Sequence, residues 1–311
     1  MRASFFWVLL LASTAAAQAT AARSVPERFA RTDPAFIVIA HRGCHNPAPA
    51  HRLPSAPENS IAALHNCIAL GVDMMETDVR QTLDGALVII HDETLDRTTT
   101  GHGPVAALTL AEIRSLRLRD NMGGAGAAAT DAALPTLDEI LAAARGRLLL
   151  NLDIKAPIYA EVIAAVERAG MADQVLVKTV AGPTTPALAS LCPYDRVPFA
   201  PILLNPHGAG DLGLIARRQT EQARPIAIEL PPMSPDQLPA VVAQAGGVRL
   251  WVNTLWRGFI DGWGGDAAAL RDPEAVWGRM LRAGITIFQT DEPEALLAFR
   301  ARSALSSLVT R

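Results

Sequence analysis

The fold that this sequence predicts is an α/β protein built as a TIM-type (β/α)8 barrel, with an inserted segment after the second strand and its hairpin. Nine short apolar or β-branched runs lie between residues 36 and 289, and helical patterns separate most of them. Strands that alternate with helices indicate a largely parallel sheet, and eight such units over about 280 residues favour a closed barrel. An open doubly wound sheet is the alternative, but no Gly-rich dinucleotide-binding loop supports it.

The expected strands number one too many for an eight-stranded barrel, and a hairpin explains the extra one. Leu83-Asp84-Gly85 separates two of the runs, and Asp-Gly between extended runs is a strong hairpin signal. We therefore expect 86–90 to return antiparallel to 73–79, with His91 roughly opposite Asp78. The nine expected strands are 36–40, 73–79, 86–90, 148–154, 175–179, 198–203, 226–230, 248–253 and 285–289.

Helix signals fill the gaps between these strands. Asn59 or Ser60 is placed to cap a helix that ends at Gly71, and a second helix is expected over 158–169. Asp272-Pro273 opens a helix that closes at Gly284. Two segments have the sequence of a capping box, Thr109–Glu112 and Thr136–Glu139.

Residues 94–135 interrupt this alternation and include the run GGAGAAA. We expect an inserted, partly flexible excursion over one end of the barrel, as many substrate-covering loops are. A disordered loop without a role is the alternative.

The amino terminus is expected to be a signal peptide and leader over residues 1–22, ahead of a barrel spanning 30–305. Arg2 precedes an apolar run at 5–12 and then small residues, which is the pattern of a secretory signal. The run is shorter than the about 20 residues needed to span a bilayer, so no stable membrane insertion is expected. We therefore expect an exported protein, periplasmic or secreted.

Composition narrows the function classes. The formal net charge is −3 and no basic run occurs, which argues against a nucleic-acid partner. Three cysteines leave at least one without a partner in the chain; a disulfide between Cys44 and Cys67 and three free thiols both remain open. The oligomeric state is not predictable from the sequence.

Polar residues gather at the carboxyl ends of the expected strands, where TIM barrels place their active sites. His41-Arg42 ends the first strand and His91 ends the hairpin return. Glu76 and Asp78 form one pair, and Asp153 and Lys155 form another. A spacing of two along a strand turns both members of a pair to the same face.

This set of residue types indicates phosphoryl chemistry. Carboxylates bind hard cations such as Mg²⁺ or Ca²⁺, and Arg42 can bind phosphate oxygens through a forked pair of hydrogen bonds. Two imidazoles suit a general acid and a general base. Taken singly, His41 could be a core histidine and Glu76 a salt-bridge partner of Lys155, but together these explanations require several coincidences.

Three longer segments resemble the glycerophosphodiester phosphodiesterase family. They are HRG at 41–43, PENS at 57–60 and GVDMMETDVRQTLDGALVIIHDETLDRTTTG at 71–101, and later similarities are NLDIK at 151–155 and GITIFQTDEPEAL at 284–296. The order and spacing of these matches cover nearly all of the chain after the leader.

The resemblance implies a TIM-type barrel that hydrolyses small-molecule glycerophosphodiesters to glycerol 3-phosphate and an alcohol. It implies an acid–base role for His41 and His91, phosphate binding by Arg42 and charge stabilisation by Lys155. One divalent cation, Mg²⁺ or Ca²⁺, is implied on Glu76, Asp78 and Asp153. It also implies a weaker, supporting role for Glu58. Outside the matched motifs, the weaker candidates for substrate contact are Lys178, Glu229, Trp251 and Asn253, and core packing is the alternative for Trp251.

Some features depart from the family pattern. The loop 44–56 is longer than usual, Asp153 replaces the usual glutamate, and 251–256 only approximates the usual W-T-V-N. Lys178 and Glu229 end expected strands and either contact substrate or form a mutual salt bridge. Two other functions remain open: a phospholipase-type lyase acting on intact phospholipid, and a non-catalytic binder of phosphorylated polyols.

Overall fold

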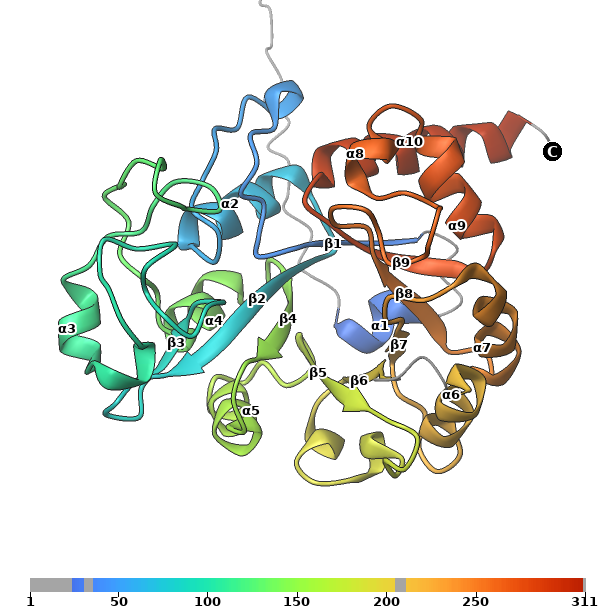
Figure 1. Ribbon diagram of the computed structural model, residues 1–311, viewed down its shortest axis with the longest axis horizontal. Helices are drawn as coiled ribbons and strands as arrows, with labels where there is room; N and C mark the ends of the chain where they lie inside the picture. The colour runs from blue at the N-terminus through green and yellow to red at the C-terminus, as the bar shows by residue number, and fades with distance from the viewer. Residues whose placement is uncertain (1–23, 31–35, 205–210, 310–311) are drawn as a thin grey trace, which may run out of the picture.

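The computed structural model describes residues 24–30, 36–204 and 211–309; the expected signal peptide and leader lie outside these residues. Eight parallel strands form a closed barrel in which β1 pairs with both β2 and β9 (Figure 1). The TIM-type barrel predicted from the sequence is thus confirmed. The strands of the described chain are β1 Ile37–Ala40, β2 Met74–Gln81, β3 Leu87–Ile89, β4 Leu149–Ile154, β5 Val175–Ala181, β6 Phe199–Leu203, β7 Ala227–Glu229, β8 Arg249–Asn253 and β9 Ile285–Thr290.

The extra strand β3 is the antiparallel return of β2, as the Asp84-Gly85 turn predicts. The expected register is off by one residue, because Val79 pairs with Ile89 and the Ile90 amide donates to the Asp78 carbonyl. The turn accounts for the shift: Thr82 and Ala86 bond across it, which centres it at Asp84 rather than after it. His91 therefore lies one position beyond the residue that faces Asp78.

Helices cover the outside of the barrel. Ser60, not Asn59, is the cap of α2, and Gly71 ends this helix in the left-handed conformation. Both predicted capping boxes are present, at Thr109 and Thr136. The helices are α1 Val25–Phe29, α2 Ile61–Leu70, α3 Leu110–Arg114, α4 Leu137–Ala144, α5 Tyr159–Arg168, α6 Leu212–Thr220, α7 Leu238–Gln244, α8 Asp266–Ala269, α9 Arg279–Arg282 and α10 Pro293–Val309. Among the described residues, no helix is long and apolar enough to cross a membrane.

The core has two layers because side chains alternate along each strand. One set packs outward against the helices, and the other fills the barrel interior around Trp251, Ile39 and Ile287. Helix α1 closes the amino-terminal end of the barrel, where Val25 and Phe29 join the interior set (Figure 1). With that end filled by apolar side chains, the polar residues of the strands lie at the opposite, carboxyl end.

The inserted segment 94–135 packs beside the β2–β3 hairpin (Figure 1). It has a small apolar cluster of its own, in which Leu95, Ile113 and Leu118 pack against Val88 and Ile90 of the hairpin. Bridges such as Thr99–Leu118 hold it together. The excursion is therefore a folded extension of the hairpin, and its polar residues contact the rim described next.

Candidate active site

Three carboxylates meet inside the carboxyl end of the barrel. Glu76 and Asp78 lie on β2, and Asp78 pairs in register with Asp153 on β4. One oxygen from each carboxylate lies within 4.8 Å of the others. Opposite oxygen ligands lie about 4 Å apart around Mg²⁺ and about 5 Å apart around Ca²⁺, so the three residues fit a divalent cation of either size.

The electrostatics of this carboxylate cluster favour a bound cation. Burial, followed by the neighbouring Asp78 charge, raises the pKa of Glu76 well above its usual value. A cation held between the acids would offset both effects. Within the described ranges the buried Asp78 Oδ1 makes no well-oriented hydrogen bond, and the Lys155 ammonium lies 3.0 Å away as its ion-pair partner.

Two lysines balance the cluster. Lys155 Nζ lies 3.0 Å from both Asp78 Oδ1 and Asp153 Oδ2, and Lys178 Nζ lies 3.5 Å from Asp153 Oδ2. Burial opposes ionisation of Asp153, but the Lys178 and Lys155 charges prevail and lower its pKa to about 2. The sequence left open that Glu76 is simply a salt-bridge partner of Lys155. In the structure the ion-pair partners of Lys155 are instead Asp78 and Asp153.

Four of the five weaker candidates form one buried polar chain next to the cluster. Lys178 Nζ donates to Glu229 at 2.9 Å, which is the mutual salt bridge left open by the sequence. Asn253 donates to the other Glu229 oxygen at 2.9 Å and accepts from the Trp251 indole at 3.1 Å. These four residues therefore hold one another, and through Lys178 they hold Asp153.

A strained turn places Arg42. Arg42 has a φ of 52° and Gly43 one of 83°, where a Cβ on Gly43 would lie 2.8 Å from Ala63 Cβ. The turn directs the Arg42 amide to Glu76 Oε2 at 2.8 Å. Arg42 Nε is buried and has no hydrogen bond to any described residue, and it lies 3.7 Å from Asp78 Oδ2. This N–H is thus placed beside the carboxylate cluster and remains able to bind an oxyanion.

Glu58 supports arginines rather than joining the carboxylate cluster. It is buried and accepts from Arg42 Nη1 at 3.1 Å and from both terminal nitrogens of Arg97 at 2.8 and 2.9 Å. Arg97 belongs to the inserted segment and also binds Asp92 through Nε at 2.7 Å. Glu58 thus links the Arg42 turn to the segment that contacts Asp92.

Each of the two histidines has its Nδ1 bonded to a carboxylate. His41 Nδ1 lies 2.8 Å from Asp291 Oδ1, and His91 Nδ1 lies 2.8 Å from Asp92 Oδ1. Because Nδ1 is engaged, Nε2 is the nitrogen of each ring that is available for proton transfer. His41 follows β1 and donates its amide to Thr290 at the end of β9, while His91 follows β3 beside β2. Both rings thus lie at the end of the barrel that carries the acids.

Sequence reasoning gave no role to several residues of the site. Asp291 lies in the TDEP segment and Arg97 in the DRTTT segment, and both segments were recognised only for their resemblance to the family. Asn59 was considered as a helix cap, but its amide donates to Asp78 Oδ2 at 2.8 Å and accepts from Thr77 at 2.7 Å. A polar residue next to a recognised motif was the available signal in each case.

Three comparisons with known proteins agree with this architecture. The profile of the Glycerophosphoryl diester phosphodiesterase family matches residues 41–184, and a second profile, of a domain of unknown function, matches 205–300. A glycerophosphodiester phosphodiesterase of Caldanaerobacter subterraneus is 29% identical over 270 residues, which is 84% of this chain and 96% of that protein.

Solved structures show the same fold. A glycerophosphoryl diester phosphodiesterase from Parabacteroides distasonis superposes with a TM-score of 0.67 at 21% identity, covering 93% of this chain and 94% of that one. A phosphodiesterase from Oleispira antarctica in complex with the product sn-glycerol-3-phosphate has a TM-score of 0.59 at 20% identity, covering 86% and 97%. The barrel and its site define a phosphoric diester hydrolase. The family profile over residues 41–184, the Caldanaerobacter relative and the solved structures together support placing the chain in the glycerophosphodiester phosphodiesterase family.

Proposed function

We propose that this enzyme hydrolyses glycerophosphodiesters to glycerol 3-phosphate and an alcohol by acid–base catalysis between His41 and His91, with a divalent cation on Glu76, Asp78 and Asp153. The observation that carries the proposal is the pair of imidazoles, each oriented by a carboxylate on Nδ1, at the end of the barrel that holds three converging acids. Mg²⁺ or Ca²⁺ bound there would act as a Lewis acid on the phosphate.

The cationic side chains bind and neutralise the phosphate. Arg42 Nε is buried, has no hydrogen-bond partner in the described part of the chain and lies beside Asp78, so it is placed to donate to a phosphate oxygen. Lys155, between Asp78 and Asp153, is placed to stabilise the negative charge that develops in the transition state.

The histidines move the protons. One imidazole takes a proton from the attacking oxygen, which is water or the glycerol hydroxyl next to the phosphoester, and the other gives a proton to the departing alkoxide. Burial, the largest effect on its ring, lowers the pKa of His91. A lowered pKa favours the neutral ring, which supports His91 as the base and His41 as the acid.

The test is product release by metal-free and reloaded protein. The chain is treated with a chelator and dialysed, Mg²⁺ or Ca²⁺ is added, and glycerol 3-phosphate released from glycerophosphocholine is measured, with phospholipid vesicles as the comparison substrate. Release should return with the cation, and His41→Ala or His91→Ala should each lower kcat by about 10³-fold with an unchanged Tm. His102→Ala, which alters an exposed histidine of the inserted segment, is the control. Near-normal turnover by either catalytic variant would refute the acid–base assignment.

We also propose that the protein is exported to the periplasm or beyond. The signal-like residues 1–22 and the Cys44–Cys67 disulfide support this, since disulfides persist in oxidising compartments. Cell fractionation with amino-terminal sequencing tests it: the protein should be found outside the cytoplasm without its leader, and an intact chain in the cytoplasm would contradict export.

A further inference from the structure

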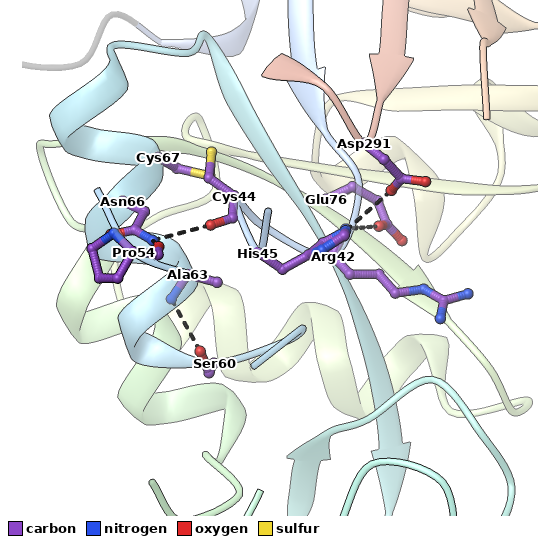
Figure 2. Close-up of a disulfide and its surroundings, with 10 residues drawn as sticks. All are labelled: Arg42, Cys44, His45, Pro54, Ser60, Ala63, Asn66, Cys67, Glu76 and Asp291. Carbon is purple, nitrogen blue, oxygen red and sulfur yellow. Dashed lines mark hydrogen bonds and ion pairs between the residues drawn. A yellow bond between two sulfur atoms is a disulfide. The ribbon is translucent and has the colours of Figure 1, made fainter. Parts of the chain in front are cut away.

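We propose that His45 is a positioning residue that holds Asp291, and through it His41, and that the Cys44–Cys67 disulfide keeps His45 in place; this rests on the proposed function. One oxygen, Asp291 Oδ1, faces both rings, with His41 Nδ1 at 2.8 Å and His45 Nε2 at 3.1 Å. His45 and Asp291 point toward one another in Figure 2, with the disulfide beside them.

The distances identify this trio as a hydrogen-bonded relay. Two imidazoles and a carboxylate are also the ligands of transition metals. Here, however, both contacts to Asp291 Oδ1 have the length of an N–H···O bond, so a proton between each pair accounts for them. With both rings donating, the His41 ring keeps its Nδ1 proton on Asp291, so that Nε2 is the nitrogen that gains and gives the transferred proton.

Packing alone does not explain His45. Its side chain is 1% exposed, and within the described residues its Nδ1 makes no hydrogen bond. A buried polar nitrogen without a partner disfavours folding, so a smaller apolar residue would suit a purely structural position better. Among residues 24–30, 36–204 and 211–309, the partner of the ring is Asp291. The geometry thus points to a role that runs through Asp291.

The backbone around His45 is fixed on both sides. Before it, Cys44 is bonded to Cys67 of helix α2, and Asn66 on the same helix donates to the Cys44 carbonyl at 3.2 Å (Figure 2). After it, Asn46 donates to the Asp291 backbone carbonyl at 3.0 Å, which ties this loop to the backbone of the residue whose carboxylate faces His45. The disulfide therefore adds a covalent restraint one residue from the ring.

The loop also supplies a matched control. His51, six positions after His45, pairs through Nδ1 with Glu294 at 2.7 Å but is exposed on the surface. It is the same residue type in the same loop, and its carboxylate partner is in the first turn of helix α10, three residues after Asp291. Replacing it removes a histidine–carboxylate pair that does not contact His41.

The test is a double-mutant cycle on kcat for glycerol 3-phosphate release. His45→Ala should lower kcat by about 10- to 100-fold with little change in KM, which is the usual size of effect for losing a residue that orients a functional side chain. His45→Gln, whose amide can donate to Asp291, should recover part of the lost kcat. In an Asp291→Ala background His45→Ala should have no further effect on kcat, because the carboxylate through which His45 acts on His41 is already missing. His51→Ala should leave kcat unchanged.

The disulfide is tested in the same assay. Cys44→Ser with Cys67→Ser should lower kcat in the presence of His45 and not in its absence, whereas Cys192→Ser, at the exposed free cysteine, should have no effect. The proposal would be overturned by an unchanged kcat in His45→Ala. It would also be overturned if His45→Ala lowered kcat by the same factor in the wild type and in the Asp291→Ala variant.

A readout without turnover separates this proposal from the proposed function. Two-dimensional ¹H–¹⁵N spectra report the His41 tautomer, which should be Nδ1–H in the wild type and mixed in His45→Ala. If no glycerophosphodiester is hydrolysed but the tautomer shifts, the proposed function fails and the positioning role stands. If turnover is normal and the tautomer is identical in both proteins, the positioning role fails.

Discussion

The two histidines of the site are held by the same contact but have different surroundings. In each ring Nδ1 lies 2.8 Å from an aspartate Oδ1 as a hydrogen-bond partner. The His41 side chain, however, is 7% exposed, whereas that of His91 is 35% exposed. Asp291 is shared with a second imidazole, from a loop fixed by a disulfide. Asp92 is instead held by the Arg97 guanidinium of the inserted segment.

The difference shows which parts of the chain the site depends on. The position of His41 depends on packing and on a loop that is bonded to helix α2. The position of His91 depends on an arginine, Arg97, that keeps its charge at all ordinary pH values. Burial opposes its charge, but the hydrogen bonds to Asp92 and Glu58 prevail and raise the pKa of Arg97 still further. The inserted segment is therefore part of the site, because it orients one of the two rings.

The largest loss of kcat is expected when the carboxylate that orients each histidine is replaced by a neutral amide. Asp291→Asn should lower kcat by about 10³-fold, because an amide no longer enforces the Nδ1–H tautomer in a buried site. Asp92→Asn should lower it by about 10- to 100-fold, since water can reach this more exposed pair. Steady-state kinetics on both purified variants test the ranking, and an equal or reversed ranking would remove burial as the reason for the difference.

A smaller effect, on stability, is expected from Arg97→Ala. Among the described residues, the change leaves the buried Glu58 with Arg42 as its remaining ion-pair partner, and it should lower the free energy of unfolding by about 2 kcal/mol or more. The control Arg114→Ala, which breaks an exposed pair with Glu139 in the same part of the chain, should cost less than about 1 kcal/mol. Urea denaturation measures both. Losses of equal size would show that Arg97 contributes only as a surface residue.

The smallest effect, taken per pH unit, is on the pH dependence of stability on the His41 side. Asp266 accepts the Asp291 amide, and burial raises its pKa to about 7. Between about pH 4 and pH 7 the unfolded chain loses this proton while the folded chain keeps it, so the carboxyl group lowers stability as pH rises, by at most about 1.4 kcal/mol per pH unit.

Asp266→Asn removes this contribution. Thermal unfolding of both proteins between pH 4 and pH 8 should show the wild type losing stability relative to the variant up to about pH 7 and not beyond. Asp131→Asn, at an exposed position of the inserted segment, should run parallel to the wild type. A constant difference between wild type and Asp266→Asn across the range would contradict the raised pKa.

The barrel could be predicted because it depends on local patterns. Each of the nine expected strands is present, and the hairpin, the capping boxes and the ends of most helices followed from residue type and spacing. The β2–β3 register was off by one residue, since the sequence does not determine where an Asp-Gly turn is centred. The disulfide was left open because it depends on the distance between the loop and helix α2, which no pattern encodes.

The site could be predicted only in part, for a related reason. Alternation along β2 and β4 identified the acids that face the interior. It could not show that Asp291 and His45 meet, because they lie far apart in the chain and neither is on a strand. It also could not show that Glu58 binds arginines rather than a cation, since a buried carboxylate suits both roles.

The most direct test of the central claim is a calorimetric titration of chelator-treated protein with Mg²⁺ and with Ca²⁺. The claim that Glu76, Asp78 and Asp153 share one cation predicts a single site in the wild type, lost in Asp78→Asn and retained in the control Glu167→Gln on the surface of α5. Binding that is absent from the wild type, or that is unchanged by Asp78→Asn, would contradict it.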